Sequence, residues 1–351
     1  MTYMQKPKFR HPALARNKAG LTRRDYEGTV STLCAGCGHD SVSAAIIEAC
    51  YQLDLPGHRV AKLSGIGCSS KTPTYFLNKA HGFNGVHGRM PAIATGANLA
   101  NRDLIYIGVS GDGDTASIGL GQFAHAVRRR LNLTYIVENN GTYGLTKGQF
   151  SATNDKNSRS KRGQDNPFGP IDLCALAIEL GAGFVARGFS GDKEQLVPMI
   201  KAALAYRGFA FIDVISPCVT FNNHAYSTKS YDYVRHHNEA VDKLDFVPEK
   251  AEISVDYAEG ETKRVQMHDG TEMALHKLDT SYDPYDAATS LASLYARRMA
   301  GEVVTGVLYL DGDQTDLHDV MKTTGTPLNQ LDPADMCPGQ AGLDKVNGEL
   351  R

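Results

Sequence analysis

The pattern of apolar and polar positions predicts a sheet that is covered by helices on both faces. Residues 104–110 and 133–137 are short, almost unbroken apolar runs with β-branched members, a pattern typical of strands in a buried parallel sheet. Strands and helices alternate along the chain, which favours a doubly wound, mostly parallel α/β fold. The predicted strands are residues 59–63, 104–110, 133–137, 184–187 and 210–216, and the predicted helices include 92–100, 172–180 and 192–206.

The pattern changes beyond about residue 240. Residues 252–278 alternate as a hairpin does, and one helix (285–299) and one strand (303–310) follow. We therefore expect a main domain over 29–240 and a C-terminal α+β appendage for subunit contacts over 241–351. Residues 1–28 are polar and basic, and we expect an N-terminal arm that lies on a partner or stays disordered. The polar stretch 147–170 fits an active-site lid or an ordinary solvated loop.

Composition narrows the class of protein. The net charge of −2, with charges scattered along the chain, argues against binding to nucleic acid or to a membrane surface. No apolar run approaches the roughly 20 residues that span a bilayer, and no secretory core follows the first methionine, so we expect a cytoplasmic protein. The seven cysteines are an odd number with irregular spacing, which favours metal ligation over a disulfide framework. Cys50 and Cys174 lie on apolar helix faces and are predicted core residues.

Unusual side chains follow several of the predicted strands. The strands are followed by Cys68, Asp112, Asn140 and Cys218. In a doubly wound sheet, ligands bind at the carboxyl ends of the strands, so these residues should converge on one site.

The sequence around Asp112 indicates a phosphate that binds together with a divalent cation. Gly111 and Gly113 let the backbone turn sharply, and Asp112 and Asp114 place carboxylates where the next helix begins. Carboxylates repel a bare anion, but a cation can bind the aspartate while the helix N-terminus binds phosphate oxygens. Asn140 follows Asp112 by 28 residues, about one helix and one strand. This spacing resembles the signature of thiamine diphosphate enzymes, whereas a dinucleotide fingerprint would need a third glycine.

The cysteines predict a second centre. Cys34 and Cys37 form a CxxC among glycines, and Cys68 and Cys218 come from distant strand ends. Four thiolates suffice for a [4Fe–4S] cluster or for a structural zinc ion. Zinc sites usually gather two local pairs, so one pair with two distant cysteines favours the iron-sulfur cluster.

As a set, these motifs resemble the beta subunit of 2-oxoacid:ferredoxin oxidoreductases, most of all the 2-oxoglutarate type. The likeness covers about residues 33–226. The motifs that carry it are Cys34-Ala-Gly-Cys-Gly-His39, Gly65-Ile-Gly-Cys-Ser-Ser-Lys71, His87-Gly-Arg89, Gly111-Asp-Gly-Asp114, Asn140 to Gln149 and Pro217-Cys218.

The resemblance implies roles for individual residues. Asp112, Asn140 and the carbonyl of Thr142 would bind Mg²⁺, and Lys71 and Lys147 would help to bind the 2-oxo acid. Cys34, Cys37, Cys68 and Cys218 would hold the [4Fe–4S] cluster. The residues expected around the diphosphate and thiazolium are Ile66, Gly67, Cys68, Ser69, His87, Gly111, Gly113, Asp114, Gly144 and Leu145.

The resemblance also implies a reaction and its partners. A 2-oxo acid, with 2-oxoglutarate favoured by the two lysines, would be decarboxylated oxidatively with coenzyme A, and ferredoxin would be reduced. The glutamate that activates thiamine has no matching segment here, so an alpha subunit would supply it and the chain would work as an αβ pair or as (αβ)₂. A cluster-free thiamine decarboxylase or synthase, a pyruvate-type enzyme and a zinc-stabilised binding subunit are the alternatives.

Overall fold

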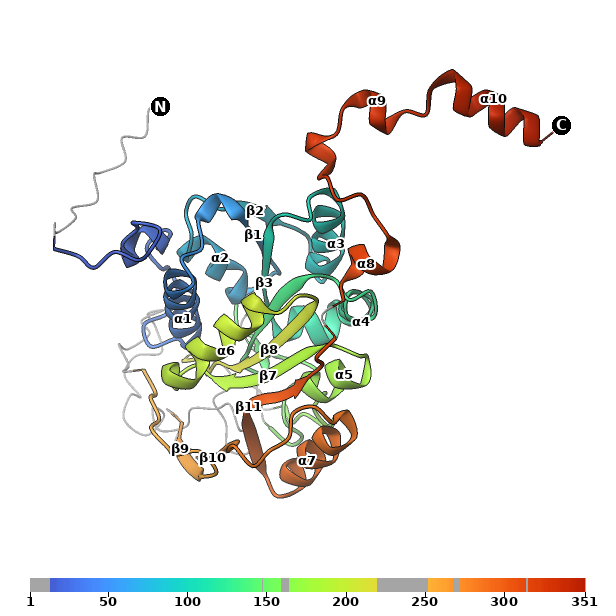
Figure 1. Cartoon of the computed structure of the whole chain (residues 1–351). Helices are drawn as coiled ribbons and strands as arrows, with labels where there is room; N and C mark the ends of the chain where they lie inside the picture. Colours follow the sequence, from blue (N-terminus) through green and yellow to red (C-terminus); the bar gives the residue numbers. More distant parts are fainter. Residues whose placement is uncertain are drawn as a thin grey trace.

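A nine-stranded sheet forms the centre of the molecule (Figure 1). The computed structural model describes residues 13–146, 148–158, 164–219, 252–267, 272–313 and 315–350. The strands of the sheet are β1 (Val60–Ser64), β2 (His81–Asn84), β3 (Ile105–Gly111), β4 (Leu133–Asn139), β7 (Phe184–Phe189), β8 (Phe209–Ile215), β9 (Thr262–Gln266), β10 (Glu272–Lys277) and β11 (Glu302–Leu310).

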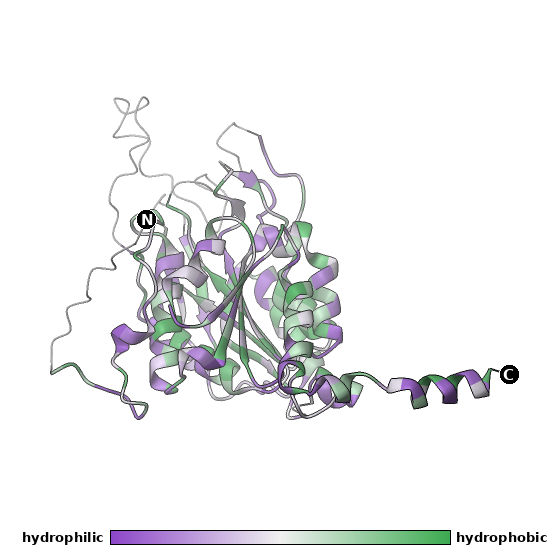
Figure 2. Cartoon of the chain, turned by 90° about the horizontal axis from the view of Figure 1, so that it is seen from above, coloured by the Kyte–Doolittle hydropathy of each residue, from purple (hydrophilic) through white to green (hydrophobic). Residues whose placement is uncertain are grey.

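Helices cover both faces of the sheet, as the apolar pattern predicts (Figures 1 and 2). The helices are α1 (Gly38–Gln52), α2 (Thr72–Tyr75), α3 (Met90–Ala100), α4 (Leu120–Arg128), α5 (Leu173–Glu179), α6 (Lys193–Ala205), α7 (Ala287–Met299), α8 (Leu317–Met321), α9 (Pro333–Met336) and α10 (Gly339–Glu349). Alternate strand residues supply two separate cores: Tyr135 and Phe211 pack toward α4 and α5, whereas Ile136 and Ile212 pack toward α1 and α6. The predicted α/β fold is confirmed.

The order of the strands is β2-β1-β3-β4-β8-β7-β11-β10-β9. The six strands β2, β1, β3, β4, β8 and β7 are parallel to one another. From β1 the chain passes outward to β2 and then crosses back over β1 to β3, so the connections after β1 and β3 run in opposite directions along the sheet. Such a reversal opens a crevice at the carboxyl ends of the two strands, and ligands of doubly wound proteins bind there.

The C-terminal α+β segment is built onto this sheet rather than standing beside it. Strand β11 pairs antiparallel with β7, and β10 and the hairpin partner β9 continue outward. Helix α7 packs against α5 and β11, so the helix layer that contains α5 extends together with the sheet. By contrast, residues 328–350 with α9 and α10 stand away from the body (Figures 1 and 2), and almost all of them are exposed.

The N-terminal segment differs from the expected free arm in its described part. Tyr26 is buried and packs edge-on against Tyr51 of α1. The backbone N–H groups of Gly28 and Leu77 donate to the carbonyls of Tyr75 and Tyr26, which ties the segment to α2. Residues 13–28 therefore belong to the folded body because an aromatic anchor and backbone hydrogen bonds fix them, while residues 1–12 lie outside the described part.

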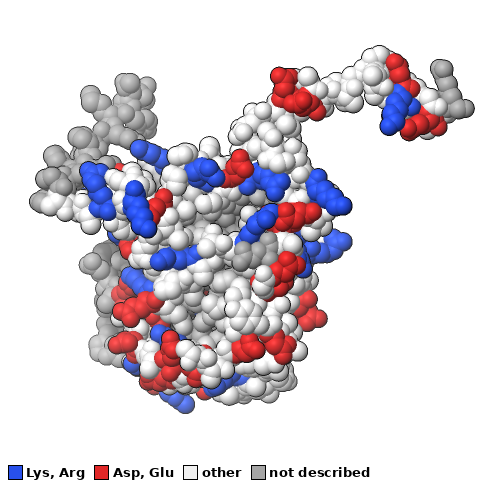
Figure 3. Space-filling view, viewed as in Figure 1, with Lys and Arg blue, Asp and Glu red and all other residues white. Residues whose placement is uncertain are grey.

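Charged side chains of both signs cover the face shown in Figure 3. Lys and Arg gather over its upper half, around α1, β2 and α3, and Asp and Glu are more frequent over its lower half. Within the described ranges, no helix is both long and apolar enough to cross a bilayer.

Candidate active site

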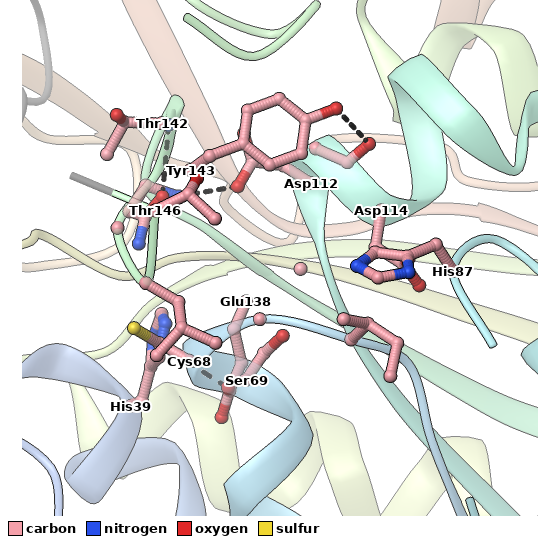
Figure 4. A pocket seen from close by; sticks show the side chains of 17 residues that line it. His39, Cys68, Ser69, His87, Asp112, Asp114, Glu138, Thr142, Tyr143 and Thr146 are labelled. Atoms are coloured by element: carbon pink, nitrogen blue, oxygen red, sulfur yellow. Dashed lines mark hydrogen bonds and ion pairs between the residues drawn. The ribbon is translucent and has the colours of Figure 1, made fainter. Parts of the chain in front are cut away.

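A cavity of about 60 Å³ opens at the carboxyl ends of β1, β3 and β4, where the chain reverses across the sheet. Three segments supply most of its wall: residues 66–69 after β1, 111–114 after β3 and 138–146 after β4. Its lining residues are His39, Ile66, Gly67, Cys68, Ser69, His87, Gly111, Asp112, Gly113, Asp114, Glu138, Asn140, Thr142, Tyr143, Gly144, Leu145 and Thr146. All ten residues expected around a diphosphate and thiazolium are therefore brought together (Figure 4).

The backbone after β3 takes an unusual form. Residues Gly113–Ile118 make a π-helical turn, and the N–H of Gly119 donates to the carbonyl of Asp114 at 2.8 Å before α4 begins. Single π turns are rare and often mark functional sites. A Cβ on Gly113 would lie only 2.6 Å from the ring of Tyr143, and the Tyr143 hydroxyl donates to the Gly113 carbonyl at 2.9 Å. Only glycine leaves room for this ring at the cavity wall.

The two candidate magnesium ligands meet as their spacing predicts. The backbone N–H of Asn140 donates to Oδ1 of Asp112 at 3.3 Å, and the Asn140 Oδ1 accepts from the N–H of Thr142 at 3.0 Å. Asp112, Asn140 and Thr142 are all buried. One carboxylate and one amide oxygen thus face the same space, and these are the ligand types that Mg²⁺ takes.

Asp114 has a more structural setting. Its two carboxylate oxygens accept from the N–H of Gly88 at 2.7 Å and from the Ser110 hydroxyl at 2.9 Å. Asp114 therefore joins the turn after β3 to the segment that carries His87, while one side of it lines the cavity.

The two predicted lysines lie differently. Lys71 ends the 3₁₀ turn Cys68–Lys71, close enough to the Cys68 thiol to act on its pKa, but it does not line the cavity. Lys147 lies outside the described residues.

Four further residues of the wall were not predicted as site residues: His39, Glu138, Tyr143 and Thr146. Glu138 ends the apolar run of β4 and is completely buried, with its carboxylate accepting from the Thr72 hydroxyl at 2.9 Å and 3.0 Å. Burial raises the pKa of Glu138 well above its ordinary value, although the Thr72 hydrogen bond opposes the shift. A charged residue at the end of a buried strand was the available signal.

His39 lies beside Glu138 on the floor of the cavity (Figure 4). Its Nδ1 is 2.6 Å from the Ser216 hydroxyl and 3.7 Å from Oε2 of Glu138. Burial lowers the pKa of His39 to about 4, so the imidazole is neutral near pH 7 and the contact with Glu138 is not an ion pair.

The four predicted cluster cysteines come from three neighbouring segments. The N–H of Cys37 donates to the Cys34 carbonyl at 3.0 Å, and the next amide, that of Gly38, donates to the Pro217 carbonyl at 3.3 Å. Burial raises the pKa of Cys37, and the nearby Cys218 raises it further. Burial also raises the pKa of Cys68; Lys71 lowers this pKa and Cys34 raises it. Cys218 thus lies near Cys37, and Cys34 lies near Cys68, close enough to act on the pKa of the neighbouring thiol.

Within the described residues, no three His, Cys, Asp or Glu side chains converge closely enough to hold a metal. Cys50 and Cys174 are fully buried core residues, as predicted.

The stretch 147–170 is buried in one part and exposed in another where it is described. Ser151, Thr153, Asn154 and Ser158 are buried, whereas residues 164, 165 and 167–169 are exposed. The N–H of Ser151 and the side-chain amide of Asn154 both donate to the carbonyl of Gly141. The polar side chains of the buried part pack inward and support the cavity wall.

The strand order, the position of the cavity and its lining define a thiamine diphosphate-binding α/β protein. A family model described as "Thiamine pyrophosphate enzyme, C-terminal TPP binding domain" matches residues 65–214, which contain most of this cavity.

Individual relatives narrow the class. The 2-oxoacid:ferredoxin oxidoreductase subunit beta of Saccharolobus solfataricus is 35% identical over 307 residues, which is 85% of this chain and 93% of the relative. The 2-oxoglutarate oxidoreductase subunit KorB of Mycobacterium tuberculosis is 41% identical over 54% of this chain and 51% of its own length. The chain belongs to the family of 2-oxoacid:ferredoxin oxidoreductase beta subunits.

A solved structure agrees with this assignment. The 2-oxoglutarate:ferredoxin oxidoreductase from Magnetococcus marinus, determined with 2-oxoglutarate, coenzyme A and succinyl-CoA bound, superposes with a TM-score of 0.66 at 27% identity. The match covers 94% of this chain and 91% of that one, so it includes the sheet extension as well as the cavity.

Proposed function

We propose that this chain binds Mg²⁺–thiamine diphosphate and, with an alpha subunit, decarboxylates 2-oxoglutarate oxidatively to succinyl-CoA while ferredoxin is reduced. The observation that carries the proposal is the convergence of Asp112, Asn140 and the turn after β1 on one cavity in a member of this family. When bound, thiamine diphosphate stabilises the carbanion that remains after loss of carbon dioxide.

The residues of the cavity suit the diphosphate end of the cofactor. Ser69 Oγ is buried at the wall and makes no hydrogen bond to the described part of the chain, so it can donate to a phosphate oxygen. A Cβ on Gly111 would lie 3.0 Å from that oxygen, so the glycine keeps the approach to Ser69 open. Asp112 and Asn140 then supply oxygen ligands for the cation that neutralises the phosphates.

The proposed cofactor has to be activated by a glutamate, and the family resemblance assigns that residue to an alpha subunit. The relative from Saccharolobus solfataricus is itself named a subunit beta. We infer that an alpha subunit completes the site and supplies the activating glutamate, in an αβ or (αβ)₂ assembly.

His39 and Glu138 lie at the floor of the cavity. Burial keeps the imidazole of His39 neutral and shifts Glu138 toward its protonated form, which limits the charge beside the thiazolium that the cofactor would place there. Lys71, near Cys68, and Lys147 are the proposed contacts for the carboxylates of the 2-oxo acid.

We further propose that Cys34, Cys37, Cys68 and Cys218 hold a [4Fe–4S] cluster. A cluster of iron and sulfide ions is several atoms wide, so its ligands stand further apart than those of one ion. The proximity of Cys218 to Cys37 and of Cys34 to Cys68, on three adjoining segments, supports a shared site for the four thiolates. Cys68 also lines the cofactor cavity, which would place an electron acceptor next to the reacting centre.

The test uses the chain co-produced and purified with its alpha partner under anaerobic conditions. We expect bound thiamine, Mg²⁺, about four irons and four sulfides per αβ pair, and ferredoxin reduction that requires both 2-oxoglutarate and coenzyme A. The isolated chain should be inactive. Turnover by the chain alone would contradict the shared site, and a complex with zinc but no iron would contradict the cluster and support a cluster-free enzyme.

A further inference from the structure

A buried chain of hydrogen bonds begins at Asp112 and runs across four strands of the sheet. Thr153 Oγ1 lies 2.5 Å from Oδ2 of Asp112 and 3.1 Å from Oδ1 of Asn139. The hydroxyl has one proton, and the shorter contact to a charged acceptor is the stronger of the two. Asn139 in turn donates from Nδ2 to Oδ1 of Asp213 at 3.0 Å.

The chain ends on a buried guanidinium. Arg187 donates from Nε to Oδ2 of Asp213 at 3.0 Å and from Nη2 to Oδ1 of Asp172 at 2.5 Å. Asp172 is fixed independently, because it caps α5 by accepting from the N–H groups of Cys174 and Ala175. The far end of the network is therefore anchored to two strands and to a helix terminus.

The network follows the order of the sheet. Asp112 comes directly after β3, Asn139 ends β4, Asp213 lies in β8 and Arg187 lies opposite it in β7, and these four strands are consecutive neighbours. Thr153 belongs to no strand; it inserts its hydroxyl between β3 and β4 from the buried segment that follows β6 (Gln149–Phe150). Within this network, Thr153 is the residue that contacts the Asp112 side chain.

Both oxygens of Asp112 are held in this arrangement. Oδ2 accepts from Thr153, and Oδ1 accepts from the backbone N–H of Asn140. With both oxygens held, the carboxylate has one orientation. A carboxylate that binds a cation depends on such outer hydrogen bonds, and their loss typically weakens metal binding 10- to 100-fold.

We propose that Thr153 is a positioning residue for the magnesium ion: its hydroxyl donates to Oδ2 of Asp112 and fixes the carboxylate in the orientation that binds the cation. The inference rests on the proposed function, because it assumes that Asp112 is a magnesium ligand. It assigns the buried segment around Thr153 a part in cofactor binding although that segment does not line the cavity.

The test compares Thr153→Val, which keeps the shape but removes the hydroxyl, with Thr153→Ser, which restores it. Thr95→Val is the matched control, because its hydroxyl bonds only to the Pro91 carbonyl within α3. In the purified αβ complex, Mn²⁺ binding in the presence of thiamine diphosphate is followed by the loss of the free Mn²⁺ paramagnetic resonance signal, and Mg²⁺ by competition.

We expect Thr153→Val to weaken Mn²⁺ binding 10- to 100-fold, and Thr153→Ser and Thr95→Val to stay within about threefold of the unmodified complex. Saturating Mg²⁺ should restore kcat in Thr153→Val, because the hydroxyl holds the ligand and does not touch the substrate. If the valine variant fails to fold, Thr153→Ala removes the same hydroxyl without adding a methyl group at that position.

Two results would overturn the inference: unchanged Mn²⁺ affinity in Thr153→Val, or a loss of kcat that saturating Mg²⁺ does not restore. Failure of the proposed function would be seen elsewhere, since the unmodified complex would then show no Mn²⁺-dependent binding of thiamine diphosphate.

Discussion

The contact between Gly113 and Tyr143 allows a sharp test of the cavity wall. In Gly113→Ala, the new Cβ would lie 2.6 Å, 2.7 Å and 3.0 Å from three carbons of the Tyr143 ring. Ordinary carbon contacts are about 3.5–4.0 Å, so the ring has to move by roughly 1 Å. That shift also stretches the 2.9 Å hydrogen bond from the Tyr143 hydroxyl to the Gly113 carbonyl beyond its useful range.

The magnitude follows from three contributions. Overpacking costs about 1–3 kcal/mol, and the lost hydrogen bond costs about 1 kcal/mol. Replacing a helical glycine by alanine returns about 0.5–1 kcal/mol. The net loss is about 1–3 kcal/mol, divided between folding stability and cofactor affinity, and each 1.4 kcal/mol of affinity is about a tenfold change in Kd.

The assay is titration calorimetry of thiamine diphosphate into the αβ complex at saturating Mg²⁺, together with thermal unfolding of the chain. Gly121→Ala is the matched control, because nothing lies within 4 Å of its added Cβ in α4. This control should stabilise the chain by about 0.5–1 kcal/mol and leave cofactor affinity unchanged. Tyr143→Ala in the Gly113→Ala background removes the clash and should recover folding stability. Unchanged stability and affinity in Gly113→Ala would refute the assignment of this wall.

Further outcomes follow from buried charges and thiols. The fold raises the pKa of Glu138 above 4.5, so the stability that this shift contributes is complete below pH 4.5 and is lost as the pH rises through the folded pKa. Glutamine does not titrate. Glu138→Gln should therefore gain stability relative to the unmodified chain as the pH rises in thermal melts from pH 4 to 8. Glu138→Ala leaves the buried Thr72 hydroxyl without its acceptor and should cost about 1–3 kcal/mol at pH 4.5, where a stability equal to that of the glutamine variant would contradict this role. Arg187→Met leaves the carboxylates of Asp172 and Asp213 without their cation. The free energy of unfolding, measured by urea denaturation, should fall by about 3–5 kcal/mol, and a loss below about 1 kcal/mol would contradict a closely coupled network. Cys218→Ser should lower the iron content of the purified complex while core Cys174→Ser keeps it, and equal iron in both would exclude Cys218 as a ligand.

Apolar periodicity predicted the central strands because each is buried on both faces and therefore reads as one continuous run. The glycine–aspartate turn and Asn140 could be paired from their spacing alone, since parallel strands bring their carboxyl ends to one edge. The pairing of β11 with β7 was not predictable in this way. It joins segments more than a hundred residues apart, and no local pattern specifies which edge an added strand will choose.

The missed site residues share a physical cause. Thr153 lies in a polar stretch that composition alone assigns to solvent, yet its hydroxyl is buried because the partner that it contacts, Asp112, is remote in sequence. Glu138 was not predicted as a site residue, because its raised pKa arises from burial that the tertiary fold produces. Hydrogen-bond partners of buried polar groups are set by packing, and packing is the part that a single sequence leaves open.

The protruding C-terminal segment raises the question of what stabilises its helix. Helix α10 has only 11 residues, three of them glycines, and its Leu343, Val346 and Leu350 side chains are about half or more exposed. A helix so short and glycine-rich is marginal in water by itself. Among the described residues, this tail buries almost no surface against the body, so it adds little to the body's free energy of unfolding. Its helical turns therefore need contacts with another surface to be stable.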